Sequence, residues 1–234
     1  MKIAICLIIK DENEYLQEWL DYHRSIGIDH FFIYDNESKI PVKSDDDITV
    51  TLWTDNNHAS QCRAYLDCCK KHSDYDYIAF IDTDEFIIMK DYTNLKDYIQ
   101  NLPVKFDGFG LSWRFYGQPK LYFEERKPMV DYIYYHEDKH IKSIVNPKKV
   151  VNFLTPHNAR LTSGAYIDEL GNRINGPWNT HTSKTIWIKH TWTRSLPEFR
   201  EKLARGSGDK IVRERSDKDF YDYNDKCTIK DDIR

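Results

Sequence analysis

The segment KIAICLIIKDENEYLQEWLDYHRSIGIDHFFIYDN, residues 2–36, decides the fold class of this chain. Its first part, residues 2–9, is a continuous apolar run of the kind that forms a strand buried on both faces of a parallel sheet. Residues 12–25 then place apolar side chains at helical spacing, and Gly27 ends the predicted helix. A second strand over residues 28–34 completes a βαβ unit, whose crossover is almost always right-handed.

The same alternation of strands and helices continues to residue 105, after which the pattern changes. Beyond that point Gly108, Gly110 and Gly117 predict short strands separated by turns. The simplest architecture is a single α/β domain, residues 1–234, in which a nucleotide-binding half (1–105) is covered by a less regular half (106–234). The further elements that we predict are strands over residues 48–53, 77–81, 142–153 and 185–190, and helices over residues 60–72, 93–102 and 196–204.

Composition narrows the classes of function. The 234 residues include 34 Lys and Arg against 38 Asp and Glu, a formal net charge of −4. This balance argues against a nucleic-acid partner, because binding to phosphates requires a basic surplus. Aromatic residues make up 14% of the chain, which excludes disorder but fits a core, an interface or sugar stacking equally well.

Two features of the sequence predict a cytoplasmic protein. No apolar run approaches the roughly 20 residues that a membrane span needs. The apolar run over residues 3–9 is too short for a signal peptide, and Lys10 and Asp11 follow it where a cleavage site would lie. The five cysteines are odd in number and lack paired C-x-x-C spacing, which predicts buried thiols in a reducing compartment.

Polar side chains collect where the predicted strands end, which is where ligands bind in open α/β sheets. Lys10, Asp35 and Asp55 follow or end the first three strands, and the pair Asp82 and Asp84 follows the fourth. Aspartate is also a common cap of turns and helices, and that interpretation is favoured for Asp35 or Asp55 alone. The Asp82-x-Asp84 pair instead offers hard oxygen ligands that suit Mg²⁺ or Mn²⁺ with a bound diphosphate.

Further segments accompany this acidic pair in a fixed order: residues 10–23, 27–38, 61–62, DTDEF (82–86), Trp113, 115–117, 125–126, KSIVNP (142–147), His157, IKHTWTRS (188–195), 198–199, Lys202 and 205–206. Together they resemble the GT-A glycosyltransferases, and specifically the family 92-like branch that is related to family 2. The resemblance implies a GT-A-type, Rossmann-like nucleotide-binding domain with a mixed central sheet and an irregular C-terminal acceptor half. Residues 161–182 have no counterpart in it, so it leaves the acceptor unidentified.

The resemblance also implies roles in binding the donor. Asp35 is expected beside the nucleotide base or ribose, and Lys10 near the diphosphate. Asp82 is expected to face the ribose and a Mn²⁺ or Mg²⁺ ion, which Asp84 and His190 would bind directly.

Three further candidates have an ordinary structural alternative. Arg63 is expected to approach a phosphate, or else a carboxylate in an ion pair on the helix surface. Trp113 is expected to stack on a sugar, or else to lie in the core. Glu125 is expected to deprotonate the acceptor hydroxyl in an inverting reaction, with Glu124 and Asp131 as rivals or a solvated helix as the alternative.

These roles imply a metal-dependent glycosyltransferase, in which the metal offsets charge on the leaving diphosphate. The expected donor is UDP-linked, with galactose as the sugar, and the expected acceptor is a glycan or glycolipid of a bacterial surface polysaccharide or lipooligosaccharide. Two other classes are retained: a metal-dependent phosphohydrolase or nucleotidyltransferase, and a non-catalytic carbohydrate-binding module. Residues 194–218 hold eight Lys and Arg against five Asp and Glu, which fits a solvated face or peripheral contact with an anionic membrane surface.

Overall fold

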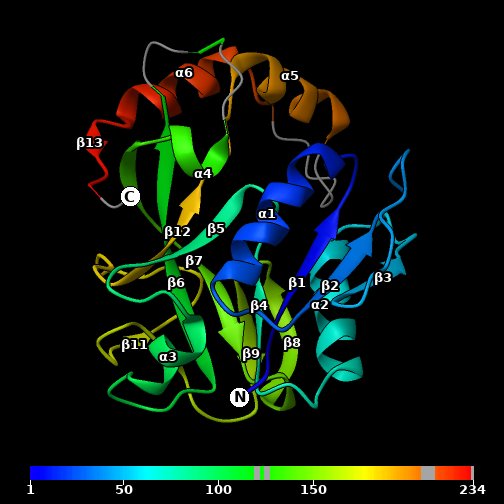
Figure 1. The fold of residues 1–234 in the computed structure, drawn as a ribbon, viewed down its shortest axis with the longest axis vertical. Coiled ribbons are helices and arrows are strands. Elements are labelled where there is room, and N and C mark those ends of the chain that lie inside the picture. The colour runs from blue at the N-terminus through cyan, green and yellow to red at the C-terminus, as the bar shows by residue number, and fades with distance from the viewer. Residues whose placement is uncertain (119–121, 124–126, 207–213, 233–234) are drawn as a thin grey trace.

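The computed structural model describes residues 1–118, 122–123, 127–206 and 214–232, which form a mixed sheet with helices around it (Figure 1). The strands of this described part are β1 (Ile3–Ile9), β2 (His30–Asp35), β3 (Ile48–Leu52), β4 (Tyr77–Phe80), β5 (Glu85–Met89), β6 (Gly108–Gly117), β7 (Tyr134–Val145), β8 (Val150–Thr155), β9 (Asn158–Leu161), β10 (Tyr166–Ile167), β11 (Arg173–Ile174), β12 (Ile186–His190) and β13 (Ile229–Lys230). The helices are α1 (Asn13–Ser25), α2 (Ser60–Lys71), α3 (Leu95–Gln100), α4 (Pro128–Asp131), α5 (Leu196–Arg205) and α6 (Asp217–Lys226), with a 3₁₀ turn η1 (Pro147–Lys149).

Four N-terminal strands form a parallel layer, as the βαβ pattern predicts. β1 pairs in parallel with β2 on one side and with β4 on the other, and β3 extends the layer beyond β2. Because these strands run in the same direction, their carboxyl ends meet along one edge of the sheet. We call this the strand-end edge and define it as residues 10–12, 35–38, 53–55 and 81–85.

The remainder of the sheet is mixed in direction. β7 pairs antiparallel with β4, and β6 pairs antiparallel with β7. β12 runs parallel to β6 and antiparallel to β5. It therefore joins β5, which follows the acidic turn of residues 82–85, to the C-terminal half. The predicted α/β class with a mixed central sheet is confirmed.

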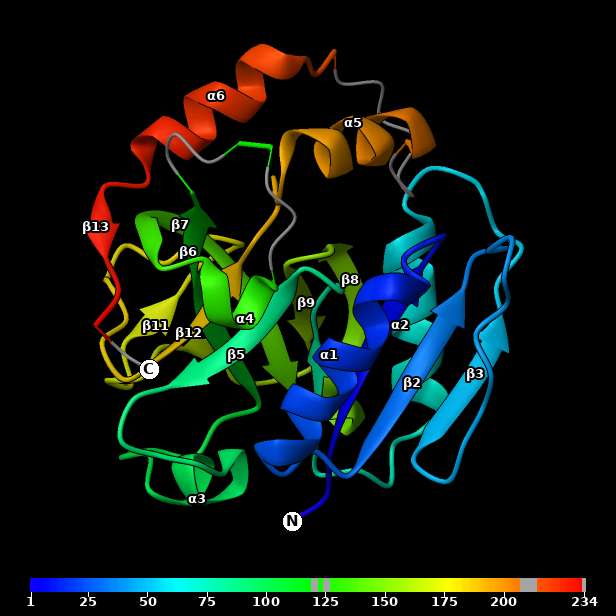
Figure 2. The same ribbon diagram turned by 45° about the horizontal axis from the view of Figure 1, so that its top comes forward.

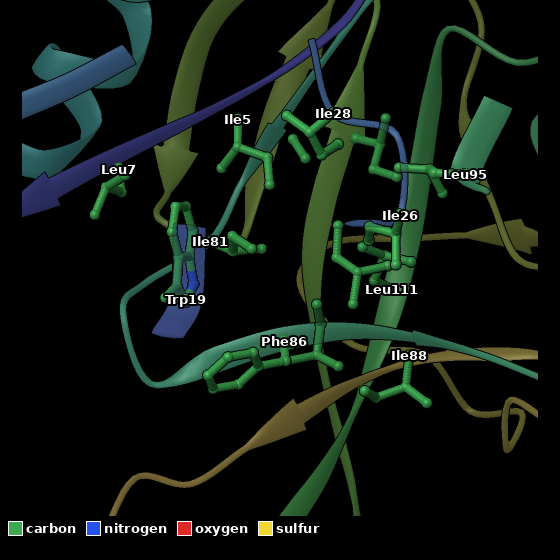
Figure 3. Close-up of a cluster of buried hydrophobic side chains, with 14 of the residues drawn as sticks. Ile5, Leu7, Trp19, Ile26, Ile28, Ile81, Phe86, Ile88, Leu95 and Leu111 are labelled. Carbon is green, nitrogen blue, oxygen red and sulfur yellow. The ribbon is translucent and has the colours of Figure 1, made fainter. Parts of the chain in front are cut away.

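Alternation along β1 divides the apolar core between the two faces of the sheet. Ile5 and Leu7 pack in the cluster that includes Trp19 of α1 (Figure 3). Ala4 and Cys6 pack in a second cluster, which includes residues of α2. Successive residues of a strand point to opposite faces, so a strand covered on both sides needs an uninterrupted apolar run.

The sequence predicts that the glycines of residues 108–117 separate short strands by turns, and this prediction is wrong. Gly108, Gly110 and Gly117 all lie in one ten-residue strand, and none has a positive φ. A Cβ atom on Gly110 would lie 2.6 Å from Cδ1 of Ile174, and one on Gly117 would lie 2.6 Å from Oδ1 of Asn224. The glycines therefore allow neighbouring side chains to approach the strand closely, a use that glycine serves as well as turns.

The prediction of one strand over residues 142–153 is wrong, because two strands occupy this region. β7 ends at Val145 and β8 begins at Val150, with η1 between them. Pro147 lacks an N–H group and cannot donate to a sheet, and Oδ1 of Asn146 accepts a hydrogen bond from the backbone of Lys148. Strand β5 and helix α6 have no counterpart among the predicted elements.

Helices α5 and α6 lie side by side at one end of the molecule and cover the C-terminal half of the sheet there (Figure 2). α5 begins at a capping box, in which Ser195 and Glu198 satisfy each other's backbone N–H groups. Phe199 and Phe220 from the two helices pack against Phe115 of β6 in a third apolar cluster. These helices pack on strands of their own half, so cover of residues 1–105 by residues 106–234 stays a prediction.

Several basic residues of this cover are paired with carboxylates. Arg200 pairs with Asp217, and Lys218 pairs with Asp222. Pairing leaves less free positive charge on α5 and α6 than the sequence suggests. The contact with an anionic membrane surface stays a prediction.

All five cysteines are buried, and none forms a disulfide. This confirms the prediction of buried thiols from their odd number and spacing. In the ranges that the structure describes, no helix combines the length and the apolar character that crossing a bilayer requires.

His23 lies on the buried face of α1 and makes the free energy of unfolding depend on pH. Its Nδ1 lies 2.8 Å from the backbone oxygen of Trp19, and its Nε2 accepts a 3.4 Å hydrogen bond from the backbone N–H of Ile87. This pairing suits a neutral ring that is protonated at Nδ1. Burial lowers the pKa of His23 from 6.5 to about 3.

Between these two pH values the unfolded chain binds more protons at this residue than the folded chain does. We therefore expect the free energy of unfolding to fall as pH is lowered from 6.5, by up to about 1.4 kcal/mol per pH unit from His23. Urea denaturation at several pH values would measure the slope in the wild type and in His23→Gln, which lacks the titrating ring. Equal slopes in the two proteins would contradict a neutral, buried His23.

Candidate functional site

The turn between β4 and β5 brings Asp82, Thr83, Asp84 and Glu85 to the strand-end edge. Trp19 of α1 fixes the turn, because its Nε1 donates to the backbone oxygens of Asp82 and Glu85 at 3.0 and 2.8 Å. Thr83, Asp84 and Glu85 are buried. Charges on buried carboxylates must be balanced by partners within the protein.

Asp82 is held by side chains from β7 and α2. Nζ of Lys142 donates to Oδ2 at 2.7 Å, and Nε2 of Gln61 donates to Oδ1 at 2.8 Å. The same Nζ lies 3.3 Å from Oε2 of Glu85, and the Lys142 side chain is only 1% exposed. Burial by itself lowers the pKa of Lys142, but Asp82 and Glu85 outweigh burial and raise it, so the ammonium group stays charged.

Asp84 is held by side chains from the C-terminal half. Lys202 of α5 forms an ion pair with Oδ2, and Nε2 of His190, at the end of β12, lies 3.6 Å from Oδ1. Burial by itself raises the pKa of Asp84, but Lys202 and His190 hold it well below its ordinary value. Burial lowers the pKa of His190 despite the nearby carboxylate, which favours the neutral ring.

Glu85 and His190 each keep one buried atom without a hydrogen-bond partner among the described residues. These atoms are Oε1 of Glu85 and Nδ1 of His190, which lie 4.0 Å apart. Burial raises the pKa of Glu85 well above its ordinary value, although Lys142 opposes the shift. Lys142 is therefore the contact that offsets the cost of burying the Glu85 carboxylate.

The three predicted metal ligands do not form one ligand set in this structure. Asp84 and His190 lie together, whereas Asp82 is bound to Lys142 and Gln61. Within the described residues, no three His, Cys, Asp or Glu side chains are arranged to hold an ion. Because Lys142 and Lys202 pair with these carboxylates, the arrangement is not that of a preformed metal site, and we derive no catalytic step through a metal. Metal binding by Asp82, Asp84 and His190 stays a prediction from the sequence.

Arg194 is a buried cation near Asp84 and Glu12. Its guanidinium group stacks on Tyr15, with Cζ 3.3 Å from the ring centroid. Nε and Nη2 are buried and have no hydrogen-bond partner in the described part of the chain. Burial by itself lowers the pKa of Arg194, but the charges of Glu12 and Asp84 raise it. A fixed guanidinium with two unused donors is suited to binding an anion.

Helix α5 also contacts the start of α1. Arg205 forms an ion pair with Glu12 and donates from Nη1 to the backbone oxygen of Asp11 at 3.0 Å. Glu12 also accepts a hydrogen bond from the hydroxyl of Thr83. Together with Lys202, Arg205 brings two cations of one helix to the strand-end edge.

Lys10 and Asp35 lie at the strand-end edge, as expected from their positions after β1 and at the end of β2. Lys10 is half-buried. Both carboxylate oxygens of Asp35 are used, because they accept hydrogen bonds from the backbone N–H groups of Ser38 and Val42, each at 2.9 Å. Asp35 therefore caps the following loop, which is the alternative that the sequence favours for it alone. Its contact with a nucleotide stays a prediction.

Arg63 forms the surface ion pair that the sequence analysis gives as its alternative role. Its Nε donates to Oδ2 of Asp55, and its Nη1 donates to the backbone oxygen of His58 at 2.8 Å. These contacts bind α2 to the loop that precedes it. Contact of Arg63 with the donor stays a prediction.

Trp113 of β6 packs against His190, which lies beside Asp84 of the acidic turn. Its ring centroid lies 4.3 Å from that of His190, 5.1 Å from that of His157 and 5.2 Å from that of His140. The side chain is half-buried, and its Nε1 has no hydrogen-bond partner among the described residues. Trp113 is therefore neither a fully enclosed core residue nor a free surface residue.

The predicted base, Glu125, and its rival Glu124 lie outside the described residues. The other rival, Asp131, ends the short helix α4. Its Oδ2 accepts a hydrogen bond from the backbone N–H of Lys127 at 2.8 Å. Asp131 therefore has a local capping role.

The cationic partners of the acidic turn are not among the site residues predicted from the sequence. Lys142, Lys202 and Arg205 belong to the segments that carry the family resemblance, but no chemistry was assigned to them. A signal was present, because carboxylates gathered at one edge require cations or hydrogen-bond donors. Lys142 also interrupts an apolar strand sequence, where an unpaired lysine is rarely buried.

Comparison with known proteins identifies the family. The sequence profile of Glycosyltransferase family 92 matches residues 2–175, which is well over half of the chain. The chain belongs to glycosyltransferase family 92. The match includes the parallel layer, the acidic turn, Trp113 and Lys142, and so covers the whole strand-end edge.

Relatives of this family 92 chain are found in plants. A family 92 protein of Oryza sativa subsp. japonica is 29% identical over 112 residues, which are 44% of this chain and 19% of that protein. One from Ricinus communis is 29% identical over 110 residues, which are 43% of this chain and 19% of that protein. The chain thus matches about a fifth of the length of these relatives.

Two solved structures of the Staphylococcus aureus protein TarS, residues 1–349, are also similar. The complex with UDP has a TM-score of 0.40 at 16% identity and covers 63% of this chain and 47% of that one. The complex with UDP-GlcNAc has a TM-score of 0.40 at 17% identity and covers 63% of this chain and 46% of that one.

Removal of Lys142 is expected to destabilise the protein strongly. Lys142→Met keeps much of the side-chain volume but leaves Asp82 without its cation and removes the ammonium group that lies 3.3 Å from Oε2 of Glu85. Breaking a buried ion pair in this way costs about 3 kcal/mol or more. Urea denaturation would measure the loss. Lys71→Met, which removes a half-exposed pair with Asp67, is the control and should cost less than about 1 kcal/mol. Equal costs for the two variants would contradict the central role of Lys142.

Proposed function

We propose that this chain is a glycosyltransferase that moves a sugar from a nucleoside diphosphate donor to a hydroxyl group of a glycan or glycolipid. The observation that carries the proposal is the family 92 match over residues 2–175. It covers the parallel layer, whose carboxyl-end edge is where open α/β sheets bind their ligands. The same edge holds the predicted donor residues Lys10, Asp35 and Asp82.

The cations beside Asp84 support a diphosphate donor. When the bond between the sugar and the phosphate breaks, negative charge develops on the leaving diphosphate, and fixed cationic donors stabilise that charge. Arg194 has two buried donors without partners among the described residues. Lys202 and Arg205 lie on the same face of the site and pair with Asp84 and Glu12. These three side chains are our candidates for contact with the phosphates.

The finer parts of the proposal come from the family resemblance. UDP is the nucleotide and galactose the first sugar to test, which would make the chain a hexosyltransferase. A bacterial surface polysaccharide or lipooligosaccharide is the proposed acceptor class, and a Mn²⁺ or Mg²⁺ ion the proposed cofactor. The buried, unbridged cysteines are consistent with a reducing, cytoplasmic location.

Nucleotide binding is expected to depend on Arg194. UDP should raise the thermal unfolding temperature of the wild type, because a ligand that binds only the folded state stabilises it. In Arg194→Met we expect about tenfold or more weaker binding of UDP, since hydrogen bonds to charged groups contribute about 1.5–3 kcal/mol. Arg200→Met is the matched control, because Arg200 lies on α5 but pairs with Asp217 on the surface. A wild type that no UDP, GDP or nucleotide sugar stabilises would contradict the proposed donor class.

Asp84 is expected to be necessary for sugar transfer. Asp84→Asn keeps the shape of the side chain but removes the charge that holds Lys202, a candidate phosphate contact. Because misplacement of such a group can cost about 100-fold in rate, we expect transfer from UDP-galactose to fall by about 100-fold. Circular dichroism would verify the fold. The same variant tests the metal: if Mn²⁺ strengthens UDP binding through Asp84, that gain should vanish in Asp84→Asn. UDP binding that is identical with and without Mn²⁺ in the wild type would oppose a metal-dependent mechanism.

A further inference from the structure

A cavity of about 230 Å³ has Trp113 of β6 in its wall. Trp113 also contacts His190, which in turn contacts Asp84, so the cavity and the candidate donor site share a wall. The other side of the cavity is formed by residues 179–183. This loop includes the end of residues 161–182, the segment without a counterpart in the family resemblance.

An irregularity in the sheet creates the cavity wall. Ser112 pairs with Ile141 and Arg114 pairs with Glu137, so three residues of β7, 138–140, lie opposite Trp113 alone. Successive residues of a regular strand point to opposite faces, but Ser112, Trp113 and Arg114 all line this cavity. Bulges of this kind redirect side chains and are common beside active sites.

The chemistry of the walls suits a neutral sugar. Arg114 and Lys139 supply two positive charges, and Glu137 and Asp138 supply two negative charges, so the formal charges cancel. Hydroxyl and amide groups from residues 179–183 add donors and acceptors, and the Trp113 ring adds an apolar face. The volume is below the roughly 300–1,000 Å³ of sites for drug-sized ligands, which favours a single sugar residue.

Asp138 is the carboxylate in this wall that is best arranged to take a proton. Its Oδ1 accepts two hydrogen bonds from His140, one from the backbone N–H at 2.8 Å and one from Nδ1 at 2.6 Å. Oδ2 has no hydrogen-bond partner in the described ranges. Burial by itself raises the pKa of Asp138, but the bonds from His140 outweigh burial and lower it, so the carboxylate is ionised at neutral pH.

We infer that this cavity binds a neutral sugar residue of the acceptor and that Asp138 takes the proton from the attacking hydroxyl. The inference rests on the proposed function, because it assigns the acceptor side of the same reaction. It replaces Glu125 as the candidate base with a residue whose surroundings are described.

In the proposed reaction, sugar transfer is a single displacement at the anomeric carbon. The O–H bond of the acceptor breaks, and its proton moves to Oδ2 of Asp138. The acceptor oxygen forms a bond to the anomeric carbon of the donor sugar, while the bond from that carbon to the phosphate oxygen breaks. The electron pair of that bond leaves with the diphosphate, and attack from the opposite face inverts the configuration at the anomeric carbon.

Turnover separates Asp138 from Asp131 and Glu125 as the candidate base. With UDP-galactose as donor and neutral p-nitrophenyl glycosides as acceptors, Asp138→Asn should lower kcat by about 100-fold or more. Its affinity for UDP, measured by thermal shift, should stay at the wild-type value, and the acidic limb of the kcat–pH profile should be lost. Asp131→Asn and Glu125→Gln, which remove the same charge elsewhere, should retain transfer. Retained transfer in Asp138→Asn, or its loss only in Asp131→Asn or Glu125→Gln, would overturn the assignment of Asp138.

Sugar binding can be measured without turnover. The indole N–H of Trp113, which has no partner among the described residues, should give an NMR signal that Trp113→Phe identifies. Methyl β-galactoside or methyl β-glucoside should shift this signal, and the anionic galacturonate should shift it less. Absence of any shift with the neutral glycosides would overturn the acceptor cavity. Failure of the wild type to bind any nucleotide would instead overturn the proposed function, whether or not the indole signal moves.

Discussion

The buried charge of Lys142 is the constraint on which the arrangement of the candidate site depends. Lys142 lies on β7, outside the parallel layer, and its ammonium group meets Asp82 and Glu85 at the end of that layer. A buried lysine is tolerated only with such partners, and the partners are tolerated only with a cation. The acidic turn and the strand that crosses beside it therefore have to be placed together.

A second set of charges repeats this arrangement on the opposite side of the turn. Asp84 and Glu12 are matched by Lys202 and Arg205 from α5. Helices α5 and α6 are thus positioned by ion pairs at the site as well as by apolar packing against β6. Cations that hold the fold in place are in this way also the cations closest to where a diphosphate is proposed to bind.

The parallel layer could be predicted from the sequence because its signals are local. The apolar run of β1, the period of α1 and Gly27 all lie within one short segment. The partners of the acidic residues could not be predicted in the same way, since Lys142 is 60 residues from Asp82 and Lys202 is 118 residues from Asp84. Such pairs depend on the tertiary fold, and spacing along the chain contains no information about them.

The C-terminal half shows a second reason why sequence patterns fail. In β6, Gly110 and Gly117 make room for Ile174 and Asn224, yet glycine at these positions has the same appearance in sequence as glycine in a turn. The bulge opposite Trp113 likewise has no signature of its own. The cavity that we assign to the acceptor arises from this bulge and from a loop that no family pattern anticipates.

The buried thiols have a consequence for how motion of this molecule can be observed. Burial raises the pKa of Cys6 well above its ordinary value and that of Cys227 to about 12. Alkylating reagents react with thiolates, so these side chains become reactive only when their surroundings open. Cys227 packs in the cluster under α5 and α6, whereas Cys6 packs in the cluster beside α2. The alkylation rates of Cys227 and Cys6 therefore report separately on the opening of these two clusters.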